Sequence, residues 1–358
     1  MAAKPVARPA ALAQPGVPDP KPRYAVWNNK GGVGKTFVTF VVAVEYAHQH
    51  PDATVVVVDM CPQCNVSEIL LGGNSSGANA LSQLLAKSPR QTIGGYFDQR
   101  VRSPHSKTGT ELSFLVDPHS FNSQLPPNMR MVAGDPSLEV QAQAINQISS
   151  QTLPGDAWAN VHKWAFDLVE SVQTQIPSAV FFLDCNPSFA AYTELALIAA
   201  TRIIVPCTAD GSSARAIDNI GQLLYGIGVP AQYQNASFAS QADRYALPLP
   251  SIHLVPLNRS TQYDRRASKA FAAMYHQIQQ RVDGLRKLAP TRFSIANPGS
   301  EFFDIPDAHS VSVVCSHKGL PLFSLRPGPY DVYDLTIQVN PEPLERYYSA
   351  VKQMVALL

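Results

Sequence analysis

Tyr24-Ala-Val-Trp-Asn-Asn-Lys-Gly-Gly-Val-Gly-Lys-Thr36 is the segment from which the fold of this chain can be predicted. Its apolar start, Tyr24 to Trp27, predicts a short strand, and the residues from Phe37 to His50 predict a helix. A glycine-rich turn between a strand and a helix is typical of a phosphate-binding loop, because the helix N-terminus and inward-turned backbone N–H groups attract anions. In such a loop Lys35 reaches the terminal phosphates and the Thr36 hydroxyl faces Mg²⁺.

The loop departs from the commonest phosphate-loop pattern, which has glycine where this chain has Asn29. It carries a second lysine, Lys30, and the order Lys-Gly-Gly-x-x-Lys-Thr is that of the deviant Walker A form. On these residues the sequence resembles the ParA/MinD family of ATPases. The resemblance implies ATP and Mg²⁺ as cofactors, and a homodimer in which ATP brings two copies face to face and Lys30 reaches the phosphates of the other copy. It assigns the nucleotide cradle to Gly31, Gly32, Val33, Gly34, Lys35, Thr36 and Phe37.

A second family motif follows the run from Thr54 to Asp59, whose β-branched residues are typical of a strand buried on both faces. The family pattern is Asp-x-Asp-Pro-Gln-x-Asn, and here Cys61 replaces the second aspartate. In the family that carboxylate helps arrange the attacking water, and a thiol cannot take its place as a base or magnesium ligand. A positioned acid–base group contributes ~10²–10⁴-fold to a rate. We therefore expect normal ATP binding with slow or partner-dependent hydrolysis, and catalytic roles for Lys30, Lys35 and Asp59.

Cys61 and Cys64 also form a Cys-x-x-Cys pair, which in principle suggests a metal or a disulfide. No second pair and no histidine at ligand spacing accompanies it. Substitution within a nucleotide motif explains the pair better.

Three more positions match the family. The strand from Ala179 to Asp184 ends at the Walker B position, so Asp184 is expected to hold Mg²⁺ through water, together with Thr36. The residues after it, Cys-Asn-Pro-Ser, resemble the family's Cys-Pro-Pro-Ser with Asn186 in place of one proline. Near the end of a later strand, Asn258 matches the residue whose amide reads adenine, strand capping being the alternative. The resemblance places two further residues beside the adenine, Pro306 and Asp307.

The fold class implied is α/β, a doubly wound, mostly parallel sheet flanked by helices, as in P-loop NTPases of the ParA/MinD/NifH-like kind. The expected organisation is a disordered, proline-rich tail over residues 1–23 and a single ATPase domain over 24–358, with inserts near 88–128 and 229–250. The first insert is predicted to be rich in loops. Single helices are predicted over 158–173 and over 267–288, the latter interrupted at Gly284. A final helix over 343–358 is predicted to pack in the core rather than on a membrane.

Composition narrows the choice of partners. The net charge is +1 and no apolar run approaches ~18 residues, so no membrane span is expected. Five cysteines, an odd number, suggest reduced thiols and a cytoplasmic location. One segment is strongly basic: residues 259–292 hold eight arginines and lysines against two aspartates.

Two functions fit this pattern. The first is DNA partitioning, with nonspecific contacts to duplex phosphates. The second is a regulatory or scaffold ATPase whose ATP-gated dimer binds a protein partner of unknown identity; a solvated helix face would then explain the charge. Partitioning relatives carry arginines where this chain has Asp307 and Ser310, and Ser310 together with Cys61 favours the second function. The basic segment and the family resemblance favour the first. The expected DNA contacts of the first are Arg259, Arg265, Arg266 and Lys269.

Overall fold

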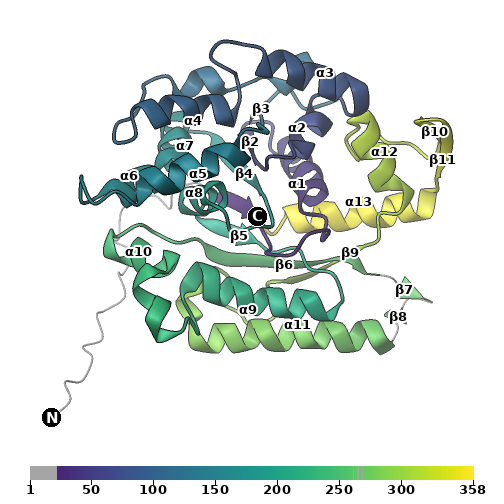
Figure 1. Cartoon of the computed structure of the whole chain (residues 1–358). Coiled ribbons are helices and arrows are strands. Elements are labelled where there is room, and N and C mark those ends of the chain that lie inside the picture. The colour runs from purple at the N-terminus through teal and green to yellow at the C-terminus, as the bar shows by residue number, and fades with distance from the viewer. Residues whose placement is uncertain (1–21, 261, 264–265, 268) are drawn as a thin grey trace.

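A seven-stranded sheet lies at the centre of the computed structural model, which describes residues 22–260, 262–263, 266–267 and 269–358 (Figure 1). The strand order is β3-β2-β4-β1-β5-β6-β9, and every neighbouring pair is parallel. The predicted fold class, a parallel sheet flanked by helices, is confirmed. The strands of this sheet are β1 (Arg23–Val26), β2 (Thr54–Met60), β3 (Met129–Val132), β4 (Ala179–Cys185), β5 (Arg202–Ile204), β6 (Ser251–Ser260) and β9 (Phe302–Pro306).

Helices cover both faces of the sheet, because alternate residues of each strand bury their side chains on opposite sides. In β1, Tyr24 and Val26 join one apolar cluster, whereas Ala25 joins the other. The first cluster is covered by α1 (Lys35–Gln49), α2 (Asn65–Leu70), α3 (Asn74–Leu85), α12 (Ser310–Lys318) and α13 (Pro341–Val355). The second is covered by α4 (Ile93–Arg102), α5 (Leu138–Ser149), α6 (Ala157–His162), α7 (Trp164–Gln175), α8 (Ala191–Ala199), α9 (Gly211–Tyr225), α10 (Phe238–Arg244) and α11 (Lys269–Leu288).

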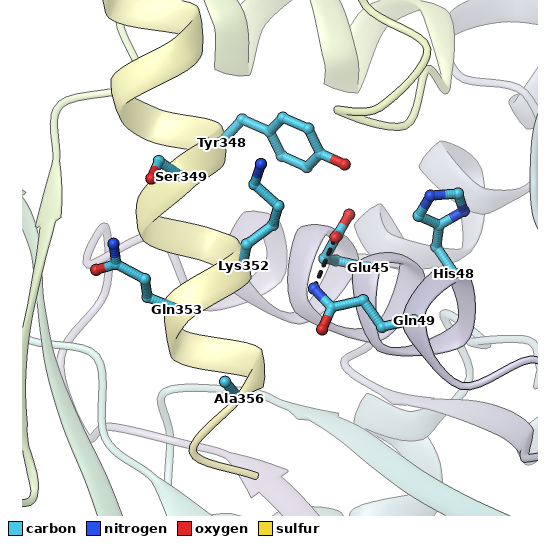
Figure 2. A pocket seen from close by; sticks show the side chains of 8 residues that line it. All are labelled: Glu45, His48, Gln49, Tyr348, Ser349, Lys352, Gln353 and Ala356. Carbon is cyan, nitrogen blue, oxygen red and sulfur yellow. Dashed lines mark hydrogen bonds between the residues drawn. The ribbon is translucent and has the colours of Figure 1, made fainter.

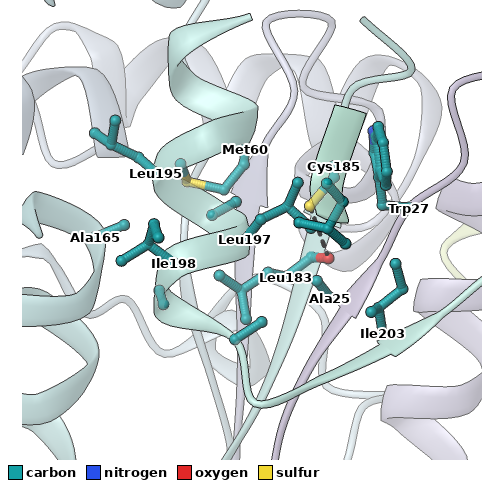
Figure 3. Close-up of a cluster of buried hydrophobic side chains, with 14 of the residues drawn as sticks. Ala25, Trp27, Met60, Ala165, Leu183, Cys185, Leu195, Leu197, Ile198 and Ile203 are labelled. Atoms are coloured by element: carbon teal, nitrogen blue, oxygen red, sulfur yellow. Dashed lines mark hydrogen bonds between the residues drawn. The ribbon is translucent and has the colours of Figure 1, made fainter. Parts of the chain in front are cut away.

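Figure 3 shows part of the second cluster, where α8 meets the sheet. Leu195 and Ile198 come from α8, and Leu183 and Ile203 come from the strands. All four are at most 1% exposed. Since burying one such side chain contributes about 1.5–3 kcal/mol, this layer stabilises the packing of α8 on the sheet.

The predicted loop-rich segment after Ser88 contains a helix, α4, that the sequence analysis missed. Gly94 and Gly95, a residue type common in loops, lie in the first turn of α4, whose N-cap Thr92 accepts a hydrogen bond from the Gly95 amide. A Cβ at Gly94 would lie 2.4 Å from the carboxyl group of Asp135, so glycine is needed there for close packing rather than for a turn. Two short 3₁₀ helices follow, Glu111–Phe114 and Pro118–Ser120.

Other predicted boundaries also differ. The single helix expected over 158–173 is two helices, α6 and α7, which meet at Lys163. The expected interruption of the later helix at Gly284 is wrong, because α11 continues through it. The hairpin of β10 (Gly328–Val332) and β11 (Leu335–Val339) was not predicted from the sequence. The remaining elements are the short strands β7 (Gln262–Tyr263) and β8 (Arg266–Ala267) and two 3₁₀ helices, Ala231–Ala236 and Pro290–Arg292.

The C-terminal helix α13 packs in the core, as predicted. Its apolar residues Leu344, Tyr347, Val351 and Val355 are buried, and it contacts α1 and β9. None of the helices in the described part of the chain combines the length and apolarity that crossing a bilayer demands. The expected tail, apart from its last two residues, lies outside the described residues.

A buried ion pair joins α4 to α7. Arg100 is 1% exposed, and its Nη1 donates to Asp167 at 2.7 Å and to the Tyr96 hydroxyl at 2.9 Å. Replacing Arg100 with methionine leaves the Asp167 carboxyl group, whose pKa burial already raises, without its cation. We expect the free energy of unfolding to fall by about 3–5 kcal/mol, measured by urea denaturation. The double variant Arg100→Met/Asp167→Leu should recover most of this loss; a single variant as stable as the natural chain would contradict the prediction.

Candidate phosphate-binding site

The loop between β1 and α1 leaves open space in front of its glycines. A Cβ at Gly31 or Gly32 would meet nothing within 4 Å. The loop turns into α1 through Gly34, whose φ of +82° is in the region that favours glycine. The first amides of α1 therefore lie at the carboxyl edge of a parallel sheet, which is where such folds bind anions.

The side chain of Asn258 locks this loop onto β6. Its Nδ2 donates to the carbonyl oxygen of Val33 at 2.8 Å, and a Cβ at Gly34 would come within 2.1 Å of that nitrogen. Asn258 is 6% exposed. The amide that the resemblance assigns to adenine is thus engaged in shaping the loop. Its role toward a base stays a prediction.

The two lysines of the loop are held differently. Lys35 is 7% exposed, and its Nζ donates to the backbone oxygen of Lys30 at 2.7 Å. Burial lowers the pKa of Lys35, and nearby Asp184 opposes this shift. The structure therefore keeps one ammonium group under the loop, within reach of the Walker B carboxylate.

Lys30 is bound within its own chain. Its Nζ pairs with Asp210 and donates to Thr208 at 2.8 Å and to Ser213 at 3.3 Å. Burial alone would raise the pKa of Asp210, but hydrogen bonds from Lys30, Ser212 and Thr208 hold it well below its usual range. The ammonium group predicted to cross to another copy is thus fixed at the start of α9.

Thr36 and Asp184 meet, as a magnesium site requires. The Thr36 hydroxyl donates to Asp184 Oδ2 at 2.9 Å, and the Thr39 hydroxyl donates to Oδ1 at 3.0 Å. Burial raises the pKa of Asp184 to about 6, against the effect of these hydroxyl groups and of Lys35. Hydroxyl and carboxylate oxygens are the ligands that Mg²⁺ prefers, so the residues present fit the ion.

Asp59 is fully buried, and both of its carboxylate oxygens accept hydrogen bonds. Its Oδ1 accepts from the Cys61 amide at 3.0 Å, and its Oδ2 accepts from the Ser67 amide and hydroxyl at 3.1 and 2.6 Å. Burial and the nearby Asp184 raise the pKa of Asp59 to about 7. This carboxyl group shapes the turn that leads into α2. Its catalytic role stays a prediction.

Two residues that differ from the family pattern, Cys61 and Asn186, contact each other. The Asn186 amide donates to the Cys61 sulfur at 3.4 Å. The sheet register pairs Met60 with Cys185, so the residues that follow them emerge side by side. Burial raises the pKa of Cys61 to about 11, so the thiol is neutral at pH 7. The sequence flagged both substitutions, but only the strand register shows that they form one pair. All five cysteines are free and buried.

The other residues assigned to the base follow β9. Pro306 ends that strand and is buried, and Asp307 accepts a hydrogen bond from the His309 amide at 3.0 Å. A cavity of about 700 Å³ is lined by Gly34, Thr36 and Phe37 together with α2, α3, α12 and the hairpin turn. No sequence signal pointed to this cavity.

Figure 2 shows a second hollow, of about 530 Å³, between α1 and α13. Glu45 is 2% exposed and accepts from the Gln49 amide at 2.8 Å. Across the hollow, the Lys352 ammonium lies 4.4 Å from the centre of the Tyr348 ring. The first contact lies within α1 and the second within α13, and the two helices pack against each other beside this hollow.

Part of the basic segment is engaged in internal pairs. Arg286 pairs at 3.0 Å with Glu301, which is fully buried, and Arg281 pairs with Asp218 at 3.2 Å. Fewer basic residues of this segment are therefore available to contact a partner than the eight in its sequence suggest. The four residues assigned to DNA lie outside the part of the chain whose side chains the structure describes: Arg259, Arg265, Arg266 and Lys269.

Comparison with known proteins agrees with this geometry. The family described as "CobQ/CobB/MinD/ParA nucleotide binding domain" matches residues 24–293. No curated protein matches. Among solved structures, apo McdA from Cyanothece is 13% identical, with a TM-score of 0.57 over 93% of this chain and 98% of its own. Protein DIP2308 from Corynebacterium diphtheriae is 18% identical, with a TM-score of 0.56 over 83% and 97%. The ParA protein of pNOB8 is 12% identical, with a TM-score of 0.55 over 93% and 96%. At such identities these likenesses show the fold alone.

Proposed function

Because the chain belongs to the CobQ/CobB/MinD/ParA family of nucleotide-binding domains, we propose that it is an ATP-binding switch that forms an ATP-dependent sandwich dimer and acts in DNA partitioning. The observation that carries the proposal is the meeting of Lys35, Thr36 and Asp184 behind a loop whose glycines face open space. An ammonium group, a hydroxyl group and a buried carboxylate are the groups that a magnesium–triphosphate needs. ATP hydrolysis, slow because Cys61 is neutral, would return the switch to its starting state.

The dimer depends on Lys30. In the single chain its ammonium group is paired with Asp210, and in the dimer it would exchange this carboxylate for the phosphates of the partner. Both are anionic, so the ammonium group of Lys30 stays paired, while Asp210 keeps its hydrogen bonds from the Ser212 and Ser213 amides. ATP binding would thus bring the two copies together, and loss of the terminal phosphate would let them separate.

Replacing Lys30 with alanine should leave ATP binding by the monomer intact but weaken ATP-dependent dimerisation at least tenfold, since a hydrogen bond to a charged group contributes about 1.5–3 kcal/mol. Light scattering with Mg²⁺–ATP measures the mass of each species. Lys87→Ala is a matched control, because Lys87 is exposed and bonds only to Gln91 among the described side chains. A Lys30→Ala chain that dimerises as the natural chain does would refute the sandwich arrangement.

The regulatory or scaffold function remains the second candidate, because Asp307 and Ser310 stand where partitioning relatives carry arginines, and Arg281 and Arg286 are already paired. Binding to random duplex DNA with ATP separates the two functions. Binding that falls steeply as salt rises supports partitioning, because phosphate contacts release counterions. An absence of binding at low salt would remove DNA and leave a protein partner.

A further inference from the structure

The loop that follows β4 is tied to the phosphate loop. The side chain of Asn29, in the phosphate loop, donates to the backbone oxygen of Pro187 at 3.2 Å. Asn29 is itself held by the Asn219 amide of α9, at 3.0 Å. A glycine, which the commonest phosphate-loop pattern has at this place, could make neither bond. The residue before Pro187, Asn186, therefore lies beside the loop that would hold the phosphates.

The strand register brings Asn186 next to a second part of the site. Because β2 and β4 pair in parallel, Cys61 and Asn186 are the first residues beyond the two strands, at the same edge of the sheet. Burial lowers the pKa of Lys35, and both Asp184 and Cys61 are among the nearby groups that oppose this shift. Asn186 thus borders the charged groups of the candidate phosphate-binding site.

The orientation of the Asn186 amide is fixed by Ser188. The backbone N–H of Ser188 donates to Asn186 Oδ1 at 2.9 Å, and the Ser188 hydroxyl donates to the same oxygen at 2.8 Å. A backbone N–H can only donate, so the amide atom that faces it is the oxygen and the other atom is the nitrogen. Both lone pairs of the oxygen are therefore used, and Nδ2 points away from Ser188.

The amide nitrogen of Asn186 has a hydrogen to spare. Nδ2 carries two hydrogens, and among the described residues it makes one hydrogen bond, to the Cys61 sulfur at 3.4 Å. Sulfur is a weak acceptor, and burial raises the pKa of Cys61 to about 11, so the thiol is neutral at pH 7. An aspartate in place of Cys61 would hold this nitrogen by a stronger, charge-assisted bond. The half-buried Asn186 side chain can therefore donate to an anion bound at the loop.

We propose that Asn186 donates a hydrogen bond to the terminal phosphate of ATP during its transfer to water, and so stabilises the charge that develops on the phosphate oxygens. The proposal rests on the proposed function, because it takes the phosphates to be at the loop. Phosphoryl transfer spreads negative charge over these oxygens, and a donor already held in place stabilises that charge without reorganising.

The reaction that Asn186 assists needs no base from the chain. The oxygen of water bonds to the terminal phosphorus while the bond from that phosphorus to the ADP oxygen breaks. One proton of the water passes to an oxygen of the transferred phosphate, because neither the Asn186 amide nor the neutral Cys61 thiol can accept it. Asn186 thus accounts for slow hydrolysis at a site that lacks the second aspartate of the family pattern.

Replacing Asn186 with alanine tests the proposal. Phosphate release in a single turnover should slow about 100-fold or more, the effect of removing one preorganised donor. The dissociation constant of Mg²⁺–ATP should not change, because the bond strengthens only as charge develops in the transition state. Mg²⁺–ADP with aluminium fluoride, which mimics the transferring group, should lose affinity in the variant. Asn146→Ala is the matched control, since Asn146 is exposed on α5, and should change none of the three.

A second variant and a double-mutant cycle separate donation from a structural role. Ser188→Ala keeps the backbone bond to Asn186 and removes the hydroxyl bond, so phosphate release should slow roughly 2- to 10-fold, the effect of one neutral hydrogen bond, without a change in ATP affinity. In a Cys61→Asp chain the new carboxylate engages the Asn186 nitrogen, so adding Asn186→Ala should slow phosphate release by a smaller factor than in the natural chain.

Each other outcome contradicts a stated part of the proposal. Unchanged phosphate release in Asn186→Ala would overturn it, and an equal loss of turnover and ATP affinity would assign Asn186 to holding the two loops together. An equal effect of Asn186→Ala with Cys61 and with aspartate would show that the two side chains act independently, against the proposal. If the natural chain binds ATP but does not hydrolyse it, the role of Asn186 fails while the switch stands. If it binds no ATP, the proposed function itself fails.

Discussion

Replacing Cys61 with aspartate is expected to raise ATP turnover by about 100-fold or more, since a positioned acid–base group contributes ~10²–10⁴-fold. The Cys61 thiol lies between the Asp59 turn and the Asn186 amide, and its pKa of about 11 leaves it protonated at pH 7. It can neither accept a proton from water nor act as an oxygen ligand. An aspartate at this position restores a carboxylate next to Asp184, and Asn186 can donate to it.

The measurement is phosphate release at saturating Mg²⁺, because the cation offsets the repulsion between the new carboxylate and Asp184. Cys61→Asn is the matched control: it has the same shape as aspartate without a basic oxygen and should not accelerate turnover. If Cys61→Asp is no faster than the natural chain, the assignment of slow hydrolysis to this substitution is wrong.

Replacing Lys35 with alanine should weaken ATP binding about 30-fold or more, because removing one member of a buried charged pair costs about 2–5 kcal/mol. Lys35 is the ammonium group that the structure holds below the loop, beside Asp184 and near Thr36. Without it the phosphates would face the Asp184 carboxylate with no opposing charge from the loop. The loss should appear as a larger dissociation constant in calorimetry.

Thermal unfolding separates loss of the site from loss of the fold. Without nucleotide, the Lys35→Ala chain should unfold at a lower temperature than the natural chain, because the buried Asp184 carboxyl group loses the nearby positive charge. With Mg²⁺–ATP, only the natural chain should gain stability, because a ligand that binds the folded state shifts the equilibrium toward it. Equal stabilisation of both chains by ATP would contradict the role given to Lys35.

The sequence predicted the parts of the site that depend on strand ends. The β-branched run of β2 and the apolar run of β4 are buried on both faces, and residues after parallel strands meet at one edge. Thr36 and Asp184 therefore met as expected. The bond from Asn258 to Val33 joins residues 225 positions apart, and no local pattern encodes which group an amide will bond.

Local sequence patterns also gave wrong or incomplete predictions where tertiary packing determines the structure. Of the glycine pair before Tyr96, Gly94 admits the Asp135 side chain beside α4, and Gly95 lies against the backbone of Arg90. Likewise, counting charges in residues 259–292 could not show that Arg286 is paired with the buried Glu301. The hairpin that carries Tyr333 lacked the usual turn glycine, so its pattern gave no warning of a turn.

Asp210 has two sets of donors. It accepts from Lys30, and its other oxygen accepts from the amides of Ser212 and Ser213, which begin α9. When Lys30 moves to a phosphate, the Asp210 carboxylate at the start of α9 loses its cation. Its interaction with the dipole of α9 then becomes stronger. Because α9 packs along α11, a spectroscopic label on the outer side of this helix pair should report the nucleotide state from across the sheet.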